Sequence, residues 1–246
     1  MFLVLSIVFF LLSPYSGAEN GDEFCPPTRC SPNGPEVRYP FRLKTQHPFC
    51  GHEGFELSCS NNKTLLHLPS SSDYYVQEIS YVYSQITIMD VQETACTLQS
   101  LLVTNLKNSR FYVPFSGEYI IFNCTEKFQV SSDDVVGPIN CLSYDRNFVY
   151  LISSFSYSEE NLPSNCIMYR TVRASIAGTK GPLTNPGIVI GWKPHKECDN
   201  CENSRDYCGF NKTSNSVMCC KHENPKFCSN YPRHRKLSSL RNFEAP

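Results

Sequence analysis

Residues 55–68 decide the fold: they run Phe55-Glu56-Leu57-Ser58-Cys59, then Ser60-Asn61-Asn62-Lys63, then Thr64-Leu65-Leu66-His67-Leu68. The first segment alternates apolar and polar side chains, which is typical of a half-buried strand. Asn tolerates the left-handed backbone of a tight turn, so the middle segment can reverse the chain. The last segment returns beside the first, and the whole stretch predicts a β-hairpin.

Further short runs of β-branched and aromatic residues follow, and scattered Gly and Pro residues separate them. No window combines sustained helical periodicity with helix caps. In the run that begins at Tyr75, strand alternation places Ile79, Tyr81 and Tyr83 on one face. The sequence therefore predicts a mostly β fold, with further strands at Tyr75–Tyr83, Ile86–Met89, Phe111–Val113, Tyr119–Asn123, Phe148–Ile152 and Met168–Val172.

Cysteine is far more frequent than usual, with 14 in 246 residues. Cysteines of an exported chain form disulfides, although spacing alone does not determine their pairing. Eight are spread over the β region and could pair among themselves: Cys25, Cys30, Cys50, Cys59, Cys96, Cys124, Cys141 and Cys166. Six are crowded near the end and predict a small disulfide-held module: Cys198, Cys201, Cys208, Cys219, Cys220 and Cys228. A zinc site built from Cys198, Cys201, Cys208, Cys219, Cys220 and His222 is the alternative, which export and crowding disfavour.

The first residues have the character of an export signal. The apolar run from Phe2 to Leu12 is too short to span a bilayer as a helix, and Ser16-Gly17-Ala18 supplies small residues for cleavage before Glu19. Three N-glycosylation sequons fit the same route, and their acceptor residues are Asn62, Asn123 and Asn211. These features predict a secreted, disulfide-rich extracellular protein.

The change in cysteine density predicts how the chain is divided. Residues 1–18 form the signal peptide and residues 19–191 a β domain. Residues 192–228 form the cysteine-rich module, and residues 229–246 form a basic tail.

Charge and motifs exclude several functions. A net charge of −1 gives no overall field that attracts nucleic acid, and no later apolar run reaches the roughly 18 residues of a transmembrane helix. The sequence lacks a nucleophile elbow, a phosphate loop and a zinc-protease helix. The adjacent acidic pair Asp133-Asp134 lies among Ser, Gly and Pro, as in a solvated loop. We predict a binding protein without catalytic residues, cofactor or metal.

A combination of motifs carries a resemblance to a plant family. The N-terminal motifs are Cys25-x4-Cys30, Val37–Leu43, Cys50-Gly51 and Gly54–Cys59, and the C-terminal ones are Trp192, Cys198-x2-Cys201 and Cys208-Gly209-Phe210. Together they resemble the galacturonan-binding domain of plant wall-associated receptor kinases. The block Asn165–Val172 is most similar to ectodomains of ATL-type RING-H2 finger proteins, and the resemblance covers about residues 25–220.

Members of that family place a membrane helix and then a RING-H2 finger or a kinase after the ectodomain. Neither follows Cys220 here, so the resemblance implies an ectodomain without its effector, from a free ectodomain gene, a splice form or a shortened gene model. Full-length relatives are expected in the plasma membrane, and this module in the cell wall or apoplast.

The ligand that the resemblance implies is homogalacturonan, the acidic backbone of pectin. Its repeated carboxylates require Arg forks or Lys ammonium groups along a groove, with aromatic planes for the sugar faces. An extended strand over Val37–Lys44 would place Arg38, Arg42 and Lys44 on one face, with His47 and His52 nearby. We predict these five as ligand-binding residues, with ordinary solvated charges as the alternative. Calcium that bridges the polymer would compete for the same carboxylates.

Two further functions stay open. One is a protein-binding disulfide domain, a decoy or co-receptor that contacts another apoplastic protein through a Tyr-rich surface. The less favoured one is a wall hydrolase, which would need buried paired carboxylates in a groove.

Overall fold

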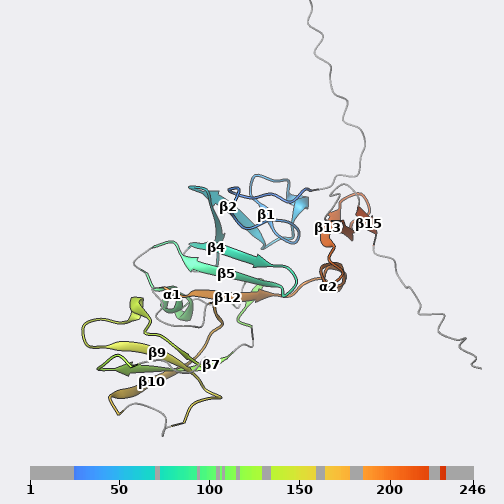
Figure 1. Cartoon of the computed structure of the whole chain (residues 1–246). Coiled ribbons are helices and arrows are strands. Elements are labelled where there is room, and N and C mark those ends of the chain that lie inside the picture. Colours follow the sequence, from blue (N-terminus) through green and yellow to red (C-terminus); the bar gives the residue numbers. More distant parts are fainter. Residues whose placement is uncertain are drawn as a thin grey trace, which may run out of the picture.

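The computed structural model describes residues 25–69, 73–92, 95–103, 106, 109–114, 117–128, 134–158, 164–177, 185–221 and 228–230. The predicted signal peptide, residues 231–246 of the predicted tail, His222 and Asp133 lie outside these ranges. Figure 1 shows the main sheet with a second sheet below it and the cysteine-rich module beside the end of β12.

The main sheet has eight strands, and β1 pairs with β2 in parallel while its other pairs are antiparallel. Its order is β1 (Arg42–Leu43), β2 (Glu56–Ser60), β3 (Lys63–His67), β4 (Asp73–Ser80), β5 (Gln85–Asp90), β12 (Gly187–Trp192) and β11 (Ile176–Ala177), with β6 (Phe111–Tyr112) also paired to β12. Strand β12 is therefore shared by β5, β6 and β11, and it brings distant segments together.

The predicted hairpin is confirmed as β2 and β3. Ser60 pairs with Lys63, which leaves Asn61 and Asn62 as a two-residue turn with φ values of 49° and 61°. Such positive values at both central positions are the reason that Asn is favoured in hairpin turns.

The second sheet has four antiparallel strands in the order β10 (Cys166–Arg173), β7 (Glu118–Cys124), β9 (Phe148–Ser153) and β8 (Val135–Val136). Its residues Ile121, Val149 and Leu151 belong to the same buried cluster as the inner residues of the main sheet. The two sheets therefore share one hydrophobic core.

The cysteine-rich module is a helix on a small sheet. Helix α2 (Lys196–Asn203) precedes three antiparallel strands, β13 (Tyr207–Asn211), β14 (Ser216–Cys220) and β15 (Cys228–Asn230). Further helical segments among the described residues include η1 (Pro48–Cys50), α1 (Thr97–Val103) and η3 (Asn140–Leu142). No helix was predicted, because segments of this length are too short for helical periodicity to be visible. The mostly β, disulfide-rich fold is confirmed.

The disulfides divide as the cysteine spacing suggested. Within the β region the pairs are Cys25–Cys50, Cys30–Cys59, Cys96–Cys141 and Cys124–Cys166. In the module they are Cys198–Cys208 and Cys201–Cys219. Cys220 is also disulfide-bonded, and Cys228 lies opposite it in strand register. Five of the proposed zinc ligands are therefore held in disulfides.

Two predicted strands were wrong in extent. Strand β4 ends at Ser80, and the chain turns at Tyr81–Ser84, so Tyr81 is 9% exposed while Tyr83 is 74% exposed. Residues 37–44 do not form one extended strand either, because a turn closed by the Phe41 N–H donating to the Arg38 carbonyl interrupts them. Alternation cannot place side chains on a common face across a turn.

Among the described residues, no helix has the length and apolarity needed to cross a membrane.

Candidate functional site

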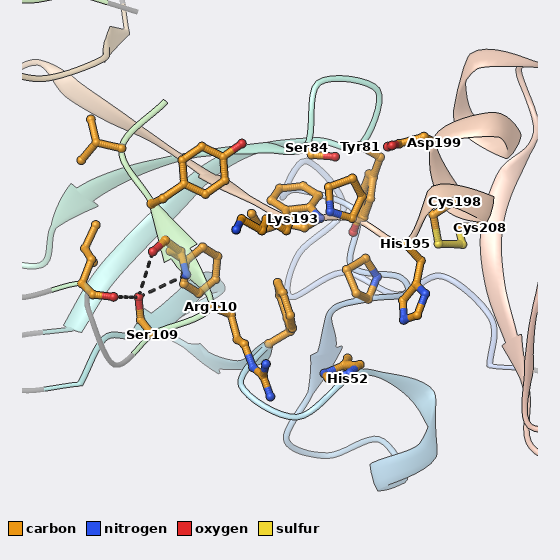
Figure 2. A pocket seen from close by; sticks show the side chains of 18 of the residues that line it. His52, Tyr81, Ser84, Ser109, Arg110, Lys193, His195, Cys198, Asp199 and Cys208 are labelled. Carbon is orange, nitrogen blue, oxygen red and sulfur yellow. Dashed lines mark hydrogen bonds between the residues drawn. A yellow bond between two sulfur atoms is a disulfide. The ribbon is translucent and has the colours of Figure 1, made fainter. Parts of the chain in front are cut away.

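The candidate site is a cleft of about 800 Å³ between the end of β12 and helix α2. Figure 2 shows side chains from β6, from the loop after β12 and from α2 around it. Aromatic and aliphatic residues form most of its lining, together with several exposed basic residues. A hollow that is largely apolar with a few polar groups is the usual form of a ligand site.

One wall of the cleft is the short ladder in which Tyr112 pairs with Gly191 and Phe111 with Trp192. Because successive strand side chains point to opposite faces, Phe111 and Trp192 share the core side, where both are buried. Tyr112 lies on the other side and is 40% exposed. The ladder therefore anchors the wall through buried rings and presents one phenol ring to the cleft.

Two basic residues flank this ring. Arg110 directly precedes β6 and Lys193 directly follows β12, so they are neighbours across the end of the ladder. Because side chains alternate along a strand, both basic residues lie on the same face of the ladder as Tyr112. All three residues line the cleft, and Figure 2 shows Arg110 and Lys193. We call Arg110, Tyr112 and Lys193 the platform.

Glycines position two members of the platform. A Cβ atom on Gly191 would lie 2.9 Å from Cζ of Tyr112, so the phenol ring lies directly against the strand backbone. A Cβ on Gly54 would lie 2.8 Å from Cγ of Arg110, and Gly54 also has a φ of 87°. The absence of side chains at these positions gives the ring and the arginine stem their places.

Two histidines lie on the opposite side of the cleft. The ring centroids of His52 and His195 are 6.4 Å apart, and both residues line the cleft (Figure 2). The Nδ1 atom of His52 is 3.0 Å from the carbonyl oxygen of Glu53, and its ring meets Phe55 edge-on. These two imidazoles bring ring nitrogens that can donate or accept hydrogen bonds to this side of the cleft.

Acidic groups are few in the lining and one of them is neutralised. Arg110, Lys193 and Arg173 line the cleft, against Asp199 and Glu202. The carboxylate of Glu202 is paired with a buried arginine, and burial raises the pKa of Asp199 above its ordinary value. Positive charge therefore predominates among the described residues of the cleft.

The buried partner of Glu202 is Arg38. Its two terminal nitrogens donate to the two carboxylate oxygens of Glu202, the second at 2.8 Å, and the backbone N–H of Cys208 also donates to this carboxylate. The guanidinium lies 3.6 Å from the ring centroid of Tyr81. Burial lowers the pKa of Arg38, but the hydrogen bonds and charge of Glu202 outweigh it and hold the pKa above its usual value. This pair joins the main sheet to the cysteine-rich module.

Two of the five predicted binding residues are thus used in ion pairs. The Arg38 side chain is 6% exposed and bound to Glu202, and the Arg42 side chain is 11% exposed and bound to Glu56. A guanidinium that already has a carboxylate partner has fewer donors for a ligand. Neither residue lines the cleft.

The other three lie at the surface in different places. Lys44 is exposed and lines a second hollow, which shares Ser109, Arg110 and Phe111 with the cleft. His47 precedes η1, and its ring accepts a hydrogen bond from the Phe49 N–H. Only His52 lies in the cleft itself.

Sequence reasoning missed the platform and His195. These residues come from segments about 80 positions apart, and only the pairing of β6 with β12 brings them together. The only local indication was a large apolar ring between two residues that a strand would place on its other face. This pattern occurs in Arg110-Phe111-Tyr112 and again in Gly191-Trp192-Lys193.

Comparison with known proteins agrees with this architecture. Residues 25–90 match the family model described as wall-associated receptor kinase galacturonan-binding. This part of the chain is therefore similar to the domain of that family. The matched residues include β1 to β5, with His52 and Lys44, but they end before the platform.

Similarity to full-length proteins extends further along the chain. RING-H2 finger protein ATL21B of Arabidopsis thaliana is 31% identical over 89% of this chain and 59% of its own length. RING-H2 finger protein ATL22 of the same plant is 27% identical over 91% of the chain and 60% of its own length. Rust resistance kinase Lr10 of Triticum aestivum is 29% identical over 54% of the chain and 24% of its own length. No solved structure matches.

The chain therefore corresponds to about 60% of the length of the RING-H2 proteins that it resembles. What it shares with the kinase and with the RING-H2 proteins is a ligand-binding receptor ectodomain, and the family and the disulfides indicate an extracellular location.

Proposed function

We propose that the cleft binds an acidic cell-wall polysaccharide, homogalacturonan, and that the chain acts in the cell wall or apoplast as a wall-sensing module. The observation that carries the proposal is the platform: an exposed Tyr112 ring beside Arg110 and Lys193 on one face of the β6–β12 ladder. The family description of the matched domain as galacturonan-binding supports the same ligand.

Each part of the platform suits one part of the polymer. Galacturonan carries a carboxylate on every sugar, and a guanidinium binds carboxylate through two parallel hydrogen bonds, whereas an ammonium acts as a point charge. The flat apolar face of a pyranose can pack on the Tyr112 ring. The imidazoles of His52 and His195 offer hydrogen-bond donors and acceptors to sugar hydroxyls on the opposite side.

Calcium enters this proposal through the ligand. Calcium prefers carboxylate oxygens, so calcium that bridges two galacturonan chains occupies the groups that Arg110 and Lys193 would bind. We expect the cleft to bind galacturonan whose carboxylates are free, and not galacturonan that is fully bridged by calcium.

The test is retention of the secreted, oxidised protein on de-esterified polygalacturonate against a neutral glucan, with rising salt. We expect retention on the acidic polymer only, lost as the ionic strength screens the charges. The variant Arg110→Ala/Lys193→Ala should bind about tenfold more weakly, a loss of roughly 1.4 kcal/mol.

Matched variants separate this site from general charge. Lys127→Ala/Arg170→Ala removes two exposed cations outside the cleft and should leave retention unchanged. Lys44→Ala tests whether the neighbouring hollow, which shares Arg110 with the cleft, also contributes to retention. Equal retention of wild type on both polymers would overturn the proposal.

One observation favours the protein-binding alternative. Strand β10 is an edge strand, and it exposes Ile167, Met168 and Tyr169 by 72%, 51% and 66%. Apolar residues on an open strand edge are a common protein contact. Under this alternative Tyr169→Glu, and not Arg110→Ala, abolishes capture of an apoplastic partner.

A further inference from the structure

Of the three sequons, the hairpin sequon Asn62-Lys63-Thr64 has two unusual properties. Its acceptor Asn62 is exposed at the tip of the β2–β3 hairpin, where its backbone has a left-handed conformation. Its third residue, Thr64, is 1% exposed, and its hydroxyl has no hydrogen-bond partner among the described residues.

The buried hydroxyl conflicts with its surroundings. Thr64 occupies an inward position of β3 in line with Leu66 and Leu68, and it lies opposite Val76 of β4. Valine has the same shape without the hydroxyl, so it would fill this position at no polar cost. A buried, unpaired polar group destabilises a fold and calls for an explanation.

Thr64 therefore gains nothing in the folded state from its hydroxyl, but the sequon needs that hydroxyl before folding. N-glycosylation recognises a hydroxyl two residues after the acceptor Asn. We propose that Asn62 carries an N-linked glycan and that position 64 has a hydroxyl-bearing residue in place of valine because glycosylation requires that hydroxyl.

The reaction uses a lipid-linked oligosaccharide diphosphate in the secretory pathway as donor. The Nδ2 atom of Asn62 forms a bond to the anomeric carbon, the bond from that carbon to the diphosphate oxygen breaks, and the lipid diphosphate leaves with the electron pair. The amide nitrogen releases one proton.

The other two sequons have less favourable settings. Asn123 lies in β7, which pairs with β10 on one side and β9 on the other, and its neighbour Cys124 is disulfide-bonded to Cys166. Asn211 is 7% exposed, and its side-chain oxygen accepts a hydrogen bond from the Ser214 N–H. We infer that Asn62 is the occupied site and that these two remain unmodified.

A groove beside Asn62 can seat the first sugars. It has a volume of about 530 Å³ and is lined in part by Asn62, Lys63 and Tyr75, with the Lys63 ammonium 4.3 Å from the Tyr75 ring centroid. This groove and the cleft have no lining residue in common. The glycan therefore leaves the cleft open, and its presence is independent of the proposed ligand.

The experiment is peptide mapping of the full chain secreted from plant cells, after enzymatic deglycosylation in ¹⁸O-labelled water. Labelled aspartate is expected at position 62 and unmodified Asn at 123 and 211. In intact mass, Asn62→Gln and Thr64→Val should each lose one glycan, whereas Thr64→Ser should retain it. Unmodified Asn62 in the wild-type protein, or a glycan at either other position, would overturn the proposal.

A second measurement tests the reason given for Thr64. The comparison is between Asn62→Gln and Asn62→Gln/Thr64→Val, both oxidised and both without a glycan at position 62, and the variant with valine should melt higher by roughly 3 °C or more. A lower melting temperature for valine would show that the hydroxyl serves the fold and would refute the argument.

Discussion

Arg38 and Glu202 are 164 positions apart in the sequence, yet they form the buried ion pair that joins the main sheet to the cysteine-rich module. The sequence analysis predicted Arg38 as a ligand-binding residue, because it precedes Arg42 and Lys44 in what reads as a strand. Nothing in the local sequence signals the distant carboxylate. At the residue scale, therefore, the role of a charged side chain depends on which partner the fold brings to it.

This pair carries a stability prediction. In Glu202→Gln the Arg38 charge stays buried but loses its bidentate partner and keeps only the Glu36 carboxylate, 3.3 Å from its Nε atom. We expect this to reduce the free energy of unfolding by up to about 3 kcal/mol. Denaturant unfolding of the oxidised protein measures the loss. Glu197→Gln, an exposed change on the same helix, is the control and should alter stability by less than about 0.5 kcal/mol. Equal stability of both variants would contradict a structural role for the pair.

At the element scale, the ladder of β6 and β12 creates the platform. Strand β6 has only two residues, and its position depends on pairing with Gly191 and Trp192. The buried rings of Phe111 and Trp192 hold the ladder on the core, so Tyr112 is held in place although it is partly exposed. A short strand with an anchored inner face thus presents a fixed binding surface.

We predict that Gly191→Ala weakens binding without unfolding the protein. The new Cβ would lie 2.9 Å from Cζ of Tyr112, and the partly exposed ring can move outward to relieve the contact. Loss of the ring contact should weaken polygalacturonate binding about fivefold, since such contacts contribute about 1 kcal/mol.

Gly187→Ala on the same strand is the matched control for that change. Its added Cβ meets the Gln77 side chain, away from the cleft, so binding should be unaffected. If both alanine variants lost binding equally, the cause would be strand β12 as a whole and not Tyr112.

At the scale of the whole molecule, buried tyrosines lie where the module meets the main sheet. Tyr39 stacks on Phe210, and the Arg38 guanidinium lies over Tyr81 and 5.4 Å from the ring centroid of Tyr207. Burial raises the pKa of Tyr39 and of Tyr81, and it raises the pKa of Tyr207 to about 12. The junction therefore keeps its tyrosines protonated.

These shifts predict alkaline destabilisation. A phenol whose folded-state pKa lies above its unfolded value of about 10 stabilises the fold fully below that value, and this stabilisation is lost as the pH rises through the folded pKa. We expect the free energy of unfolding to be level up to about pH 9 and to fall between about pH 10 and 12. Denaturant titrations at several pH values across this range measure the free energy of unfolding. Tyr207→Phe should make this free energy fall less steeply with pH. An equally steep fall in the variant would assign the effect to other groups.

Much of the fold could be predicted because its signals are local. The hairpin of β2 and β3 follows from alternation and two Asn residues, and the separation of the disulfides into two groups follows from cysteine density. Strand length was harder, since the alternation through Tyr83 continues past the turn that ends β4. Among the five predicted site residues, only His52 lies in the cleft, because a turn at Arg38–Phe41 separates residues that an extended strand would align.

The sequence by itself determined the class of this protein: a mostly β, disulfide-rich module related to receptor ectodomains, as composition, cysteine spacing and short motifs require. Only the tertiary structure decided where the cationic cleft lies and which charges remain available to a ligand. Arg110 and Lys193 become neighbours through strand pairing, and Arg38 is removed from the surface by Glu202. Both outcomes depend on contacts between residues far apart in the chain, which local sequence patterns do not encode.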